Sequence, residues 1–463
     1  MLAAERAPAP RGGGALTGLL WPGDYGTAMA SLGFQWAWDR LAEGGLQCHR
    51  YLGSVRGERF DLPEAGPPLS LEGGLPLGHM DLVAISIAAE ADLGPLVRML
   101  DAAGIPPLRQ HRRGGPPVIA GGPLTRSNPS PLLALADVVV WGDGEAAMAR
   151  LLEVAEGGLP DGEGLRAAMA GAPGVLLEEP TAWTPWAEPD PLPVVARGTT
   201  PDCAFPGMRL VEPVRGCPRA CAFCVCTRSA APFRCLDAAR ALAAIPPEEP
   251  RVGLVGAGIG DWPALRPVLE ALADRGTTVG VSSLRADRVD QGLLEALVRA
   301  GTRTITLALD GASDRLRTSV RKGITAASFL QAVEAARAAG ACGVKVYAMV
   351  CLPGEEDADV DELAALLREA SRRLGVVLAL SPFVPKRGTP LEDAAFGPMP
   401  LLAARIDRLR RGLPRGVRLA QVSPREAWVE HALSHLRAER AEALLAGARA
   451  GGRYVDWRRA LGD

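Results

Sequence analysis

Residues 215–224 read Arg215-Gly216-Cys217-Pro218-Arg219-Ala220-Cys221-Ala222-Phe223-Cys224. The three cysteines are separated by three residues and then by two, and they follow a strand predicted over 209–214. Three thiolates on one short loop can hold three irons of a four-iron, four-sulfur (4Fe–4S) cube, so that the fourth iron stays open to a substrate or cofactor. The small residues Gly216, Ala220 and Ala222 let the loop wrap closely around such a cluster.

Zinc is the alternative metal for this motif. Structural zinc usually takes four ligands from paired cysteine knuckles, and the sequence holds no second knuckle. Cys226 or Cys235 could supply a fourth thiolate, so a zinc site or a closed electron-transfer cluster stays open as an alternative. An odd count of nine cysteines in a chain without an apparent export signal favours metal ligation over a disulfide framework.

Strand and helix patterns alternate on the carboxyl side of the motif. Strands are predicted at 209–214, 252–255, 278–281, 304–307, 344–350 and 376–380, and helices at 262–274, 291–300, 326–339 and 360–374. This series predicts a (β/α)6 partial TIM barrel over 206–395, with the chemistry at the carboxyl ends of the strands. A helical C-terminal extension is expected over 396–463.

A second α/β series precedes the motif. Strands predicted at 15–21, 82–87, 117–120 and 138–140 alternate with helices at 27–43, 95–103 and 145–155. Such alternation predicts a doubly wound, Rossmann-like domain over 1–155. The segment 156–205 is rich in Pro, Gly and Trp and is expected to be a linker.

Charge and hydropathy exclude several classes of partner. The formal net charge of −2 gives no general attraction to nucleic acid. No run reaches the roughly 18 apolar residues that span a membrane, and residues 1–14 lack the apolar core of a secretory signal, so a cytoplasmic protein is expected.

The cysteine trio resembles the hallmark of the radical S-adenosylmethionine (SAM) superfamily. The resemblance implies that the open iron binds SAM and that the reduced cluster, supplied with electrons by a flavodoxin or ferredoxin, cleaves SAM to a 5′-deoxyadenosyl radical. That radical abstracts hydrogen from an unactivated position. The cluster and SAM thus supply the radical chemistry, and the protein supplies binding and orientation. No acid–base pair is required, and none is assigned.

The resemblance extends to the turns that end the later strands. It implies contacts to SAM from Phe223, Gly256, Ala257, Gly258, Ser282, Ser283, Arg285, Asp310, Leu352 and Pro353. Asp310 stands where the superfamily usually has Glu, and its shorter side chain is expected to reach a ribose hydroxyl. Arg321 and Lys322 could meet a carboxylate or phosphate, or lie exposed on the surface.

The segment 19–145 resembles the cobalamin-binding domain that precedes the radical domain in one branch of the superfamily. The implied cobalamin contacts are Tyr25, Gly33, Ser86, Gly121, Gly122, Pro123, Gly142, Gly144 and Glu145. Small residues at strand ends would let a corrin lie against the backbone. The first loop has no histidine to ligate cobalt, which leaves a domain without corrin as the alternative. Methylthiotransferases need three further cysteines in this region, where only Cys48 is present.

The leading hypothesis is therefore a radical SAM enzyme that uses cobalamin to methylate an unactivated carbon of a small, natural-product-type substrate. A second hypothesis keeps the radical but leads to rearrangement, oxidation or cyclisation without methyl transfer. A third, from another class, is a non-catalytic iron–sulfur or corrinoid-binding protein.

Overall fold

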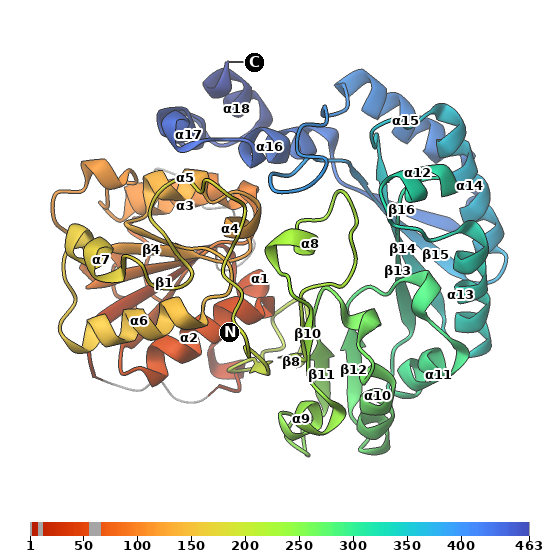
Figure 1. Cartoon of the computed structure of the whole chain (residues 1–463), viewed down its shortest axis with the longest axis horizontal. Coiled ribbons are helices and arrows are strands. Elements are labelled where there is room, and N and C mark those ends of the chain that lie inside the picture. Colours follow the sequence, from red (N-terminus) through yellow and green to blue (C-terminus); the bar gives the residue numbers. More distant parts are fainter. Residues whose placement is uncertain (1, 8–12, 55–65, 463) are drawn as a thin grey trace. The chain divides into compact units, whose positions relative to one another are not determined.

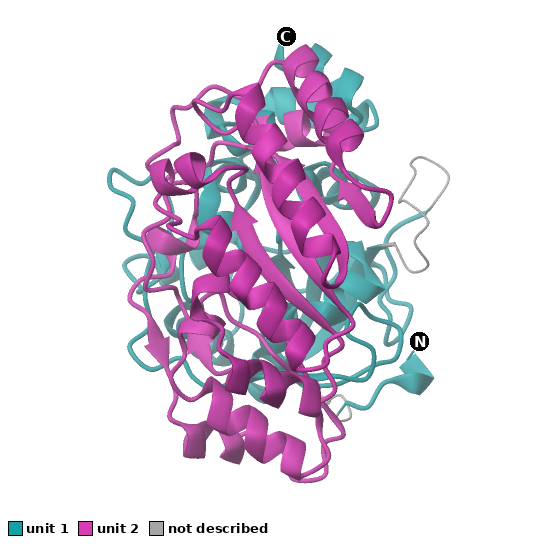
Figure 2. Ribbon diagram, turned by 90° about the vertical axis from the view of Figure 1, so that its right-hand side faces the viewer, with its two compact units in different colours: residues 1–210, 432–463 teal, residues 211–431 magenta. Residues whose placement is uncertain are grey.

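The computed structural model describes residues 2–7, 13–54 and 66–462. The chain divides into two compact units, which Figure 2 shows in different colours. The first unit combines residues 1–210 with 432–463, and the second comprises 211–431. The expected C-terminal extension is therefore shared, because 396–431 belongs to the second unit and 432–463 to the first.

The first unit is built on a sheet with the strand order β2-β1-β3-β4-β5-β6. Its strands are β1 (Leu16–Asp24), β2 (Gln47–Ser54), β3 (Leu82–Ser86), β4 (Val118–Gly121), β5 (Val138–Val140) and β6 (Val175–Leu176). The strands β1 to β5 pair in parallel, and β6 is antiparallel to β5. The winding direction reverses between β1 and β3, as in flavodoxin-like sheets, whose ligands bind at such a switch point.

Helices cover both faces of this sheet. The set comprises α1 (Tyr25–Ala30), α2 (Leu32–Glu43), α3 (Leu93–Ala102), α4 (Leu124–Ser127), α5 (Ser130–Leu135), α6 (Glu145–Glu156) and α7 (Gly162–Met169). In Figure 1, α3 and α5 lie on one face, and α2 and α6 on the other. All residues of β3 are buried, as expected for a parallel strand with helices on both sides. The doubly wound fold predicted from sequence is confirmed.

Three local predictions for this unit were wrong or incomplete. The helix expected over 27–43 is two helices, because Ser31 is extended and its hydroxyl caps α2 through the Phe34 N–H. The edge strand β2 was missed because its sequence does not alternate clearly between polar and apolar residues. The expected linker contains α7, β6 and the short strand β7 (Val194–Val195).

The second unit contains a series of parallel strands. They are β8 (Arg209–Glu212), β11 (Arg251–Leu254), β12 (Thr278–Val281), β13 (Thr304–Asp310), β14 (Gly343–Val350), β15 (Gly375–Pro382) and β16 (Val417–Gln421). One sheet contains the neighbours β12-β11-β8 and another β13-β14-β15-β16, and a parallel bridge between Leu284 and Leu307 joins the two. The order along the chain is therefore the order in space, as in an open barrel. The six predicted strands are present, and β16 is a further strand inside the region expected to be helical.

Helices surround these strands on their outer side (Figure 1). They are α9 (Ala238–Ala243), α10 (Leu265–Asp274), α11 (Gln291–Arg299), α12 (Asp314–Ser319), α13 (Ala326–Ala338), α14 (Asp357–Ser371) and α15 (Met399–Gly412). Alternate residues of β14, from Val344 to Val350, are buried, whereas Lys345, Tyr347 and Met349 between them are partly exposed. The partly exposed set faces the barrel interior, where Ala308 and Ala379 flank Tyr347 on the neighbouring strands. The interior next to Tyr347 is therefore lined by small side chains.

The last helices of the chain pack on the first unit. After α16 (Pro424–Ser434), the helices α17 (Ala441–Arg449) and α18 (Tyr454–Leu461) follow. Trp457 of α18 is 2% exposed, and a Cβ atom on Gly447 of α17 would lie 2.2 Å from its ring. Asn128 donates to the carbonyl oxygens of Leu433 and Leu436 at 3.0 and 2.9 Å. The C-terminal residues are thus part of this unit's core.

We predict that Trp457→Ala destabilises the first unit by about 3–5 kcal/mol, because the change removes a large buried side chain and leaves a cavity. Urea unfolding followed by circular dichroism measures the loss. Val455→Ala is the matched control, because Val455 lies on the same helix and is 55% exposed. Equal shifts of the two unfolding midpoints would contradict this packing account.

Candidate iron–sulfur and SAM site

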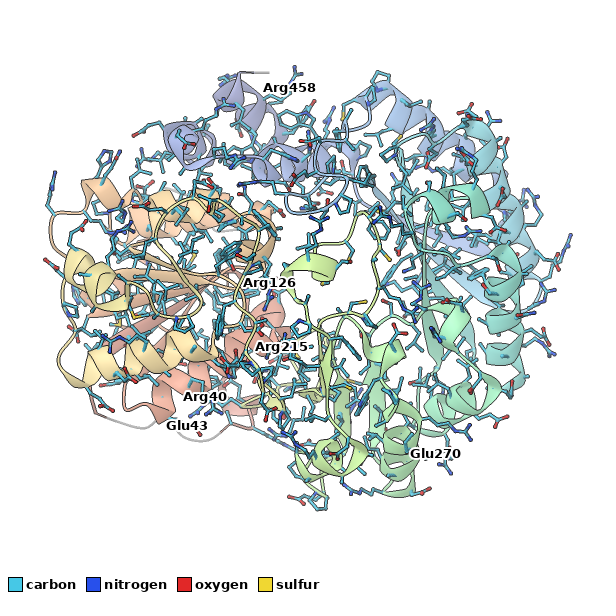
Figure 3. The ribbon with its side chains drawn as sticks, in the orientation of Figure 1. Arg40, Glu43, Arg126, Arg215, Glu270 and Arg458 are labelled. Atoms are coloured by element: carbon cyan, nitrogen blue, oxygen red, sulfur yellow. The ribbon has the colours of Figure 1, made fainter. Side chains whose placement is uncertain are left out.

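A short antiparallel ribbon closes the loop that carries the three cysteines. Strand β9 (Val214–Arg215) enters the loop and pairs with β10 (Arg234–Cys235), which leaves it. Between them lie the cysteines and the one-turn helix α8 (Cys226–Ser229). Arg215, labelled in Figure 3, forms an ion pair with Glu212 at 2.7 Å at the base of this loop. The cysteines are therefore held on a closed loop that follows the first barrel strand.

Gly216 is required by the way this loop folds back on itself. Its φ is +84°, and a Cβ atom there would lie 2.2 Å from the carbonyl oxygen of Ala230 and 2.8 Å from that of Pro232. A side chain at this position would force the two ends of the loop apart. The sequence predicted that this glycine lets the loop wrap closely around a cluster; in the structure its close approach is to the returning chain.

The three thiols have no disulfide partner; Cys221 is buried, and Cys217 and Cys224 are partly exposed. The loop is tethered by the Ala222 N–H, which donates to Val320 O at 2.9 Å, and by the Cys224 N–H, which donates to Cys221 O at 3.2 Å. Three free thiols on a fixed loop fit the thiolate ligands of an iron–sulfur cluster.

Burial, nearby charges and hydrogen bonds shift the pKa values of these thiols in different directions. Burial raises the pKa of Cys217 and of Cys221, while the nearby Lys322 ammonium acts in the opposite direction on Cys221. A hydrogen bond with Cys226 lowers the pKa of Cys224 to about 6. In the part of the chain that the structure describes, no three His, Cys, Asp or Glu side chains are grouped to bind one metal ion.

The predicted glycine turn after β11 packs against the base of the cysteine loop. A Cβ atom on Gly256 would lie 2.6 Å from Val214 O, and one on Gly258 would lie 2.9 Å from Gly216 O. The Ser282 hydroxyl, which follows β12, donates to Gly256 O at 3.0 Å. The ends of β11 and β12 are thus brought to the cysteine loop, with Ala257 between the two glycines.

Charged groups from β12, β13 and the segment after α12 meet near Cys221. The Lys322 ammonium lies 2.6 Å from the Asp310 carboxylate, and Lys322 is 8% exposed. Arg285 donates to Lys322 O at 2.7 Å, and the charges of Lys322, Arg285 and Asp310 all act on the Cys221 thiol. The structure therefore places the predicted residues Arg285 and Asp310 near the same thiol and adds Lys322. From the sequence, Lys322 could have been either a contact for an anion or an exposed surface residue.

The remaining predicted SAM contacts lie on two segments. Leu352 is buried and Pro353 exposed in the turn after β14, and Phe223 is partly exposed on the cysteine loop. Ser283 is partly exposed after β12. These four residues occupy carboxyl ends of strands or the cysteine loop, where the sequence placed them.

Several residues predicted to contact cobalamin are in contact with the chain itself. The Tyr25 hydroxyl donates to Glu5 at 2.6 Å in the core. A Cβ atom on Gly122 would lie 2.5 Å from Ile87 O, one on Gly142 2.2 Å from Trp186 O, and one on Gly144 3.3 Å from the Trp36 ring. The room that these glycines make on the Cβ side is thus filled by other parts of the same unit.

The other predicted cobalamin residues are differently placed. Gly33 is exposed, and nothing lies within 4 Å of its Cβ position. Ser86 is buried at the end of β3, Gly121 is partly exposed at the end of β4, and Pro123 is exposed. Ser86 and Gly121 are paired on the neighbouring strands β3 and β4, and a Cβ atom on Gly121 would lie 3.3 Å from the Val140 side chain.

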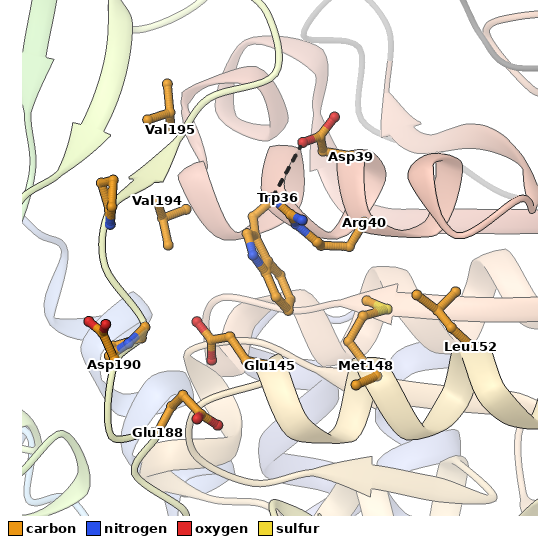
Figure 4. Close-up of a pocket in the computed structure, with 13 residues that line it drawn as sticks. Trp36, Asp39, Arg40, Glu145, Met148, Leu152, Glu188, Asp190, Val194 and Val195 are labelled. Atoms are coloured by element: carbon orange, nitrogen blue, oxygen red, sulfur yellow. Dashed lines mark ion pairs between the residues drawn. The ribbon is translucent and has the colours of Figure 1, made fainter. Parts of the chain in front are cut away.

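Glu145 lines a cavity of about 560 Å³ within the first unit. Trp36 and Asp39 of α2 and Met148 of α6 form two sides, and the segment 188–195 forms another (Figure 4). Next to it, the Asp143 carboxylate pairs with Arg126 and accepts the Glu188 N–H at 2.8 Å. Sequence reasoning found only Glu145 here, because the cavity depends on a segment with no regular pattern.

In the described residues, no helix combines the length and apolar character needed to span a membrane.

Two family models match the chain. One described as "Radical SAM proteins, N-terminal" matches residues 46–171, and one described as "Radical SAM superfamily" matches residues 211–367. An uncharacterised protein of Methanocaldococcus jannaschii is 28% identical over 330 residues, which are 69% of each chain.

Solved structures extend the similarity to the fold of the whole chain. The structure of TsrM from Kitasatospora setae, described as a radical SAM methyltransferase with cobalamin and a 4Fe–4S cluster bound, has a TM-score of 0.63 and 13% identity, and the match covers 94% of this chain and 99% of that one. The radical enzyme OxsB, with aqua-cobalamin and SAM bound, has a TM-score of 0.50 and 13% identity over 87% of this chain and 58% of that one. With both family models and the cysteine loop in agreement, the chain belongs to the radical SAM superfamily.

Proposed function

We propose that the protein binds a 4Fe–4S cluster through Cys217, Cys221 and Cys224 and uses it to cleave SAM, with cobalamin as the partner cofactor for methylation of an unactivated carbon. The observation that carries this proposal is the closed loop of three unpaired cysteines with Lys322, Arg285 and Asp310 next to Cys221. When bound, the reduced cluster supplies the electron that converts SAM to the hydrogen-abstracting 5′-deoxyadenosyl radical.

The residues around the loop have positioning roles in this proposal. Arg285 and Lys322 provide positive charge for the SAM carboxylate, and Asp310 accepts a ribose hydroxyl. Gly256, Ala257 and Gly258 let the methionine end approach the backbone, and Ser282 and Ser283 contact the ribose or carboxylate. Phe223, Leu352 and Pro353 form the apolar surface for adenine. Correct orientation is the main contribution that such residues make to a radical reaction.

Cobalamin use is supported by the similarity to TsrM over nearly the full length of both chains and by the switch point between β1 and β3. Gly33, Ser86, Gly121 and Pro123 are the residues we assign to its binding. The substrate of this proposal is a small, natural-product-type molecule, and the electron donor is a flavodoxin or ferredoxin.

A radical reaction without methyl transfer is the second candidate. It is favoured by Gly122, Gly142 and Gly144, whose space is filled by the chain itself. In this case the first unit keeps the doubly wound fold but binds no corrin. This is possible because the same fold can serve different functions. The radical would then lead to rearrangement, oxidation or cyclisation.

We predict that Cys217→Ser, Cys221→Ser and Cys224→Ser each reduce formation of 5′-deoxyadenosine by at least about 100-fold, since loss of a direct ligand costs at least as much as loss of an outer partner. Iron analysis and chromatography of the reduced, reconstituted variants measure this effect. Cys342→Ser is the control, because Cys342 is exposed. Full activity in any of the three variants, or stoichiometric zinc in the native protein, would overturn the assignment.

We predict that Gly216→Ala lowers cluster occupancy after anaerobic reconstitution, because the new Cβ atom collides with the backbone at Ala230. Gly207→Ala is a matched control: Gly207 also has a positive φ, +64°, but nothing lies within 4 Å of its Cβ position. The control therefore carries only the cost of placing alanine at a positive φ, about 1–2 kcal/mol. Equal iron contents in the two variants would show that the loop does not need this close approach.

We predict that the protein purified anaerobically with added cobalamin retains about one cobalamin per chain, measured by ultraviolet–visible spectroscopy. The Cys217→Ser variant is expected to retain the same amount, because the assigned cobalamin residues lie in the other compact unit. Absence of cobalamin bands at full cluster occupancy would remove methylation and leave the second candidate.

A further inference from the structure

A buried ion pair lies beneath the turn that follows β14. The Glu355 side chain is completely buried, and its Oε1 atom lies 3.2 Å from Nη1 of Arg405 on α15. The Arg405 guanidinium also donates to the backbone oxygen of Glu355 and approaches the Cys351 sulfur at 3.5 Å. Burying two charges costs free energy that their attraction often does not recover, so such a pair is weak evidence for stability alone.

The pair holds a residue in an unusual backbone conformation. Cys351 has a φ of +62°, a left-handed backbone conformation that is unfavourable for a residue other than glycine. The Cys351 N–H donates to Glu355 Oε1 at 2.8 Å, and this is the same oxygen that faces Arg405. On the other side, a Cβ atom on Gly397 would lie 2.8 Å from the Cys351 Cβ. The positive-φ conformation of Cys351 is therefore restricted both by its hydrogen bond to Glu355 and by the backbone at Gly397.

The conformation of Cys351 sets the direction in which the chain leaves β14. The strand ends at Val350, and residues 351–354 form the turn, with Gly354 also at a positive φ of +74°. Leu352 and Pro353, assigned above to adenine, lie between these two residues. A change of backbone conformation at 351 would move both of them.

We propose that Arg405, acting through Glu355, is a positioning residue that fixes the turn 351–354 in the shape needed to bind the adenine of SAM. This inference rests on the proposed function, because it concerns the SAM site of that proposal. Arg405 lies outside residues 211–367, which match the superfamily model, so the region after the matched domain contributes to cofactor binding.

The electrostatics around Glu355 agree with this role. Burial raises the pKa of Glu355 to about 7, and the Arg405 charge opposes the rise. The carboxylate of Asp359, on α14, acts in the same direction as burial. Loss of the guanidinium would thus favour protonation of Glu355 and remove its ion pair. The hydrogen bond that Glu355 accepts from the Cys351 N–H would then be weaker.

The test compares Arg405→Met with Arg408→Met in the full-length, cluster-loaded protein. Arg408 lies one turn along the same helix and pairs with Asp357 and Asp361 on the surface. It matches Arg405 in residue type and in its link to α14, because Nε of Arg405 also lies 3.8 Å from Asp357. We expect Arg405→Met to raise the Kd and KM for SAM about 10-fold with a smaller change in kcat, and Arg408→Met to leave all three unchanged. If Arg405→Met does not fold, Arg405→Lys replaces it in the test. Lysine keeps the positive charge but lacks the planar guanidinium with its several donors, so a smaller rise in the Kd for SAM is expected.

A rescue experiment separates positioning from a purely structural role. Glycine adopts a positive φ freely, so Cys351→Gly should make the anchor unnecessary and return the SAM affinity of the Arg405→Met protein to near the native value. A double variant that still binds SAM weakly while its cluster content is native would overturn the inference. So would equal SAM affinities for Arg405→Met and the native protein.

The native protein distinguishes failure of the two proposals. If the native, cluster-loaded protein binds no SAM, the proposed function fails, and this inference fails with it. If the native protein binds SAM and the Arg405 variants bind it equally well, only the positioning role is wrong.

Discussion

The close approach of Gly216 to the backbone at Ala230 and Pro232 is the constraint on which the candidate site depends. It lets the chain leave the first barrel strand, carry three cysteines around a loop and return to pair with itself as β9 and β10. The glycine turn after β11 packs against the backbone at Gly216, because Gly258 lies next to Gly216 O. A loop closed in this way presents three thiols without a disulfide or a second cysteine knuckle, an arrangement that would leave one iron of a bound cluster open.

Around that loop, the barrel brings together charges that are distant in the sequence. Asp310 ends β13 with a positive φ and pairs with Lys322, and Arg285 contacts the Lys322 carbonyl oxygen and the Asp287 carboxylate. Charges of both signs next to a cysteine loop, with Lys322 buried and Asp310 and Arg285 partly exposed, suit a zwitterionic cofactor such as SAM, whose carboxylate and amino groups need partners of opposite charge. The inferred role of Arg405, which acts through Glu355, concerns the turn at the carboxyl end of another barrel strand, β14.

The sequence was sufficient to predict features that depend on neighbouring residues. The place of the cysteine loop after the first barrel strand, the succession of barrel strands and the turn at Gly256 and Gly258 all follow from short patterns. The contacts that join distant segments could not be predicted in this way: Arg405 lies 50 residues from Glu355, and Trp186 fills the space at Gly142. Small residues after strands suggested room for a corrin, but a glycine allows close approach by protein backbone as readily as by a ligand.

The central claim is that the three cysteines leave one iron of a 4Fe–4S cluster open to SAM. Electron paramagnetic resonance of the reduced, reconstituted protein, recorded with and without SAM, tests it most directly. We expect the signal of a single reduced 4Fe–4S cluster whose shape changes when SAM is added, because the cofactor coordinates the open iron. A fully loaded cluster whose signal stays identical in saturating SAM would contradict the account.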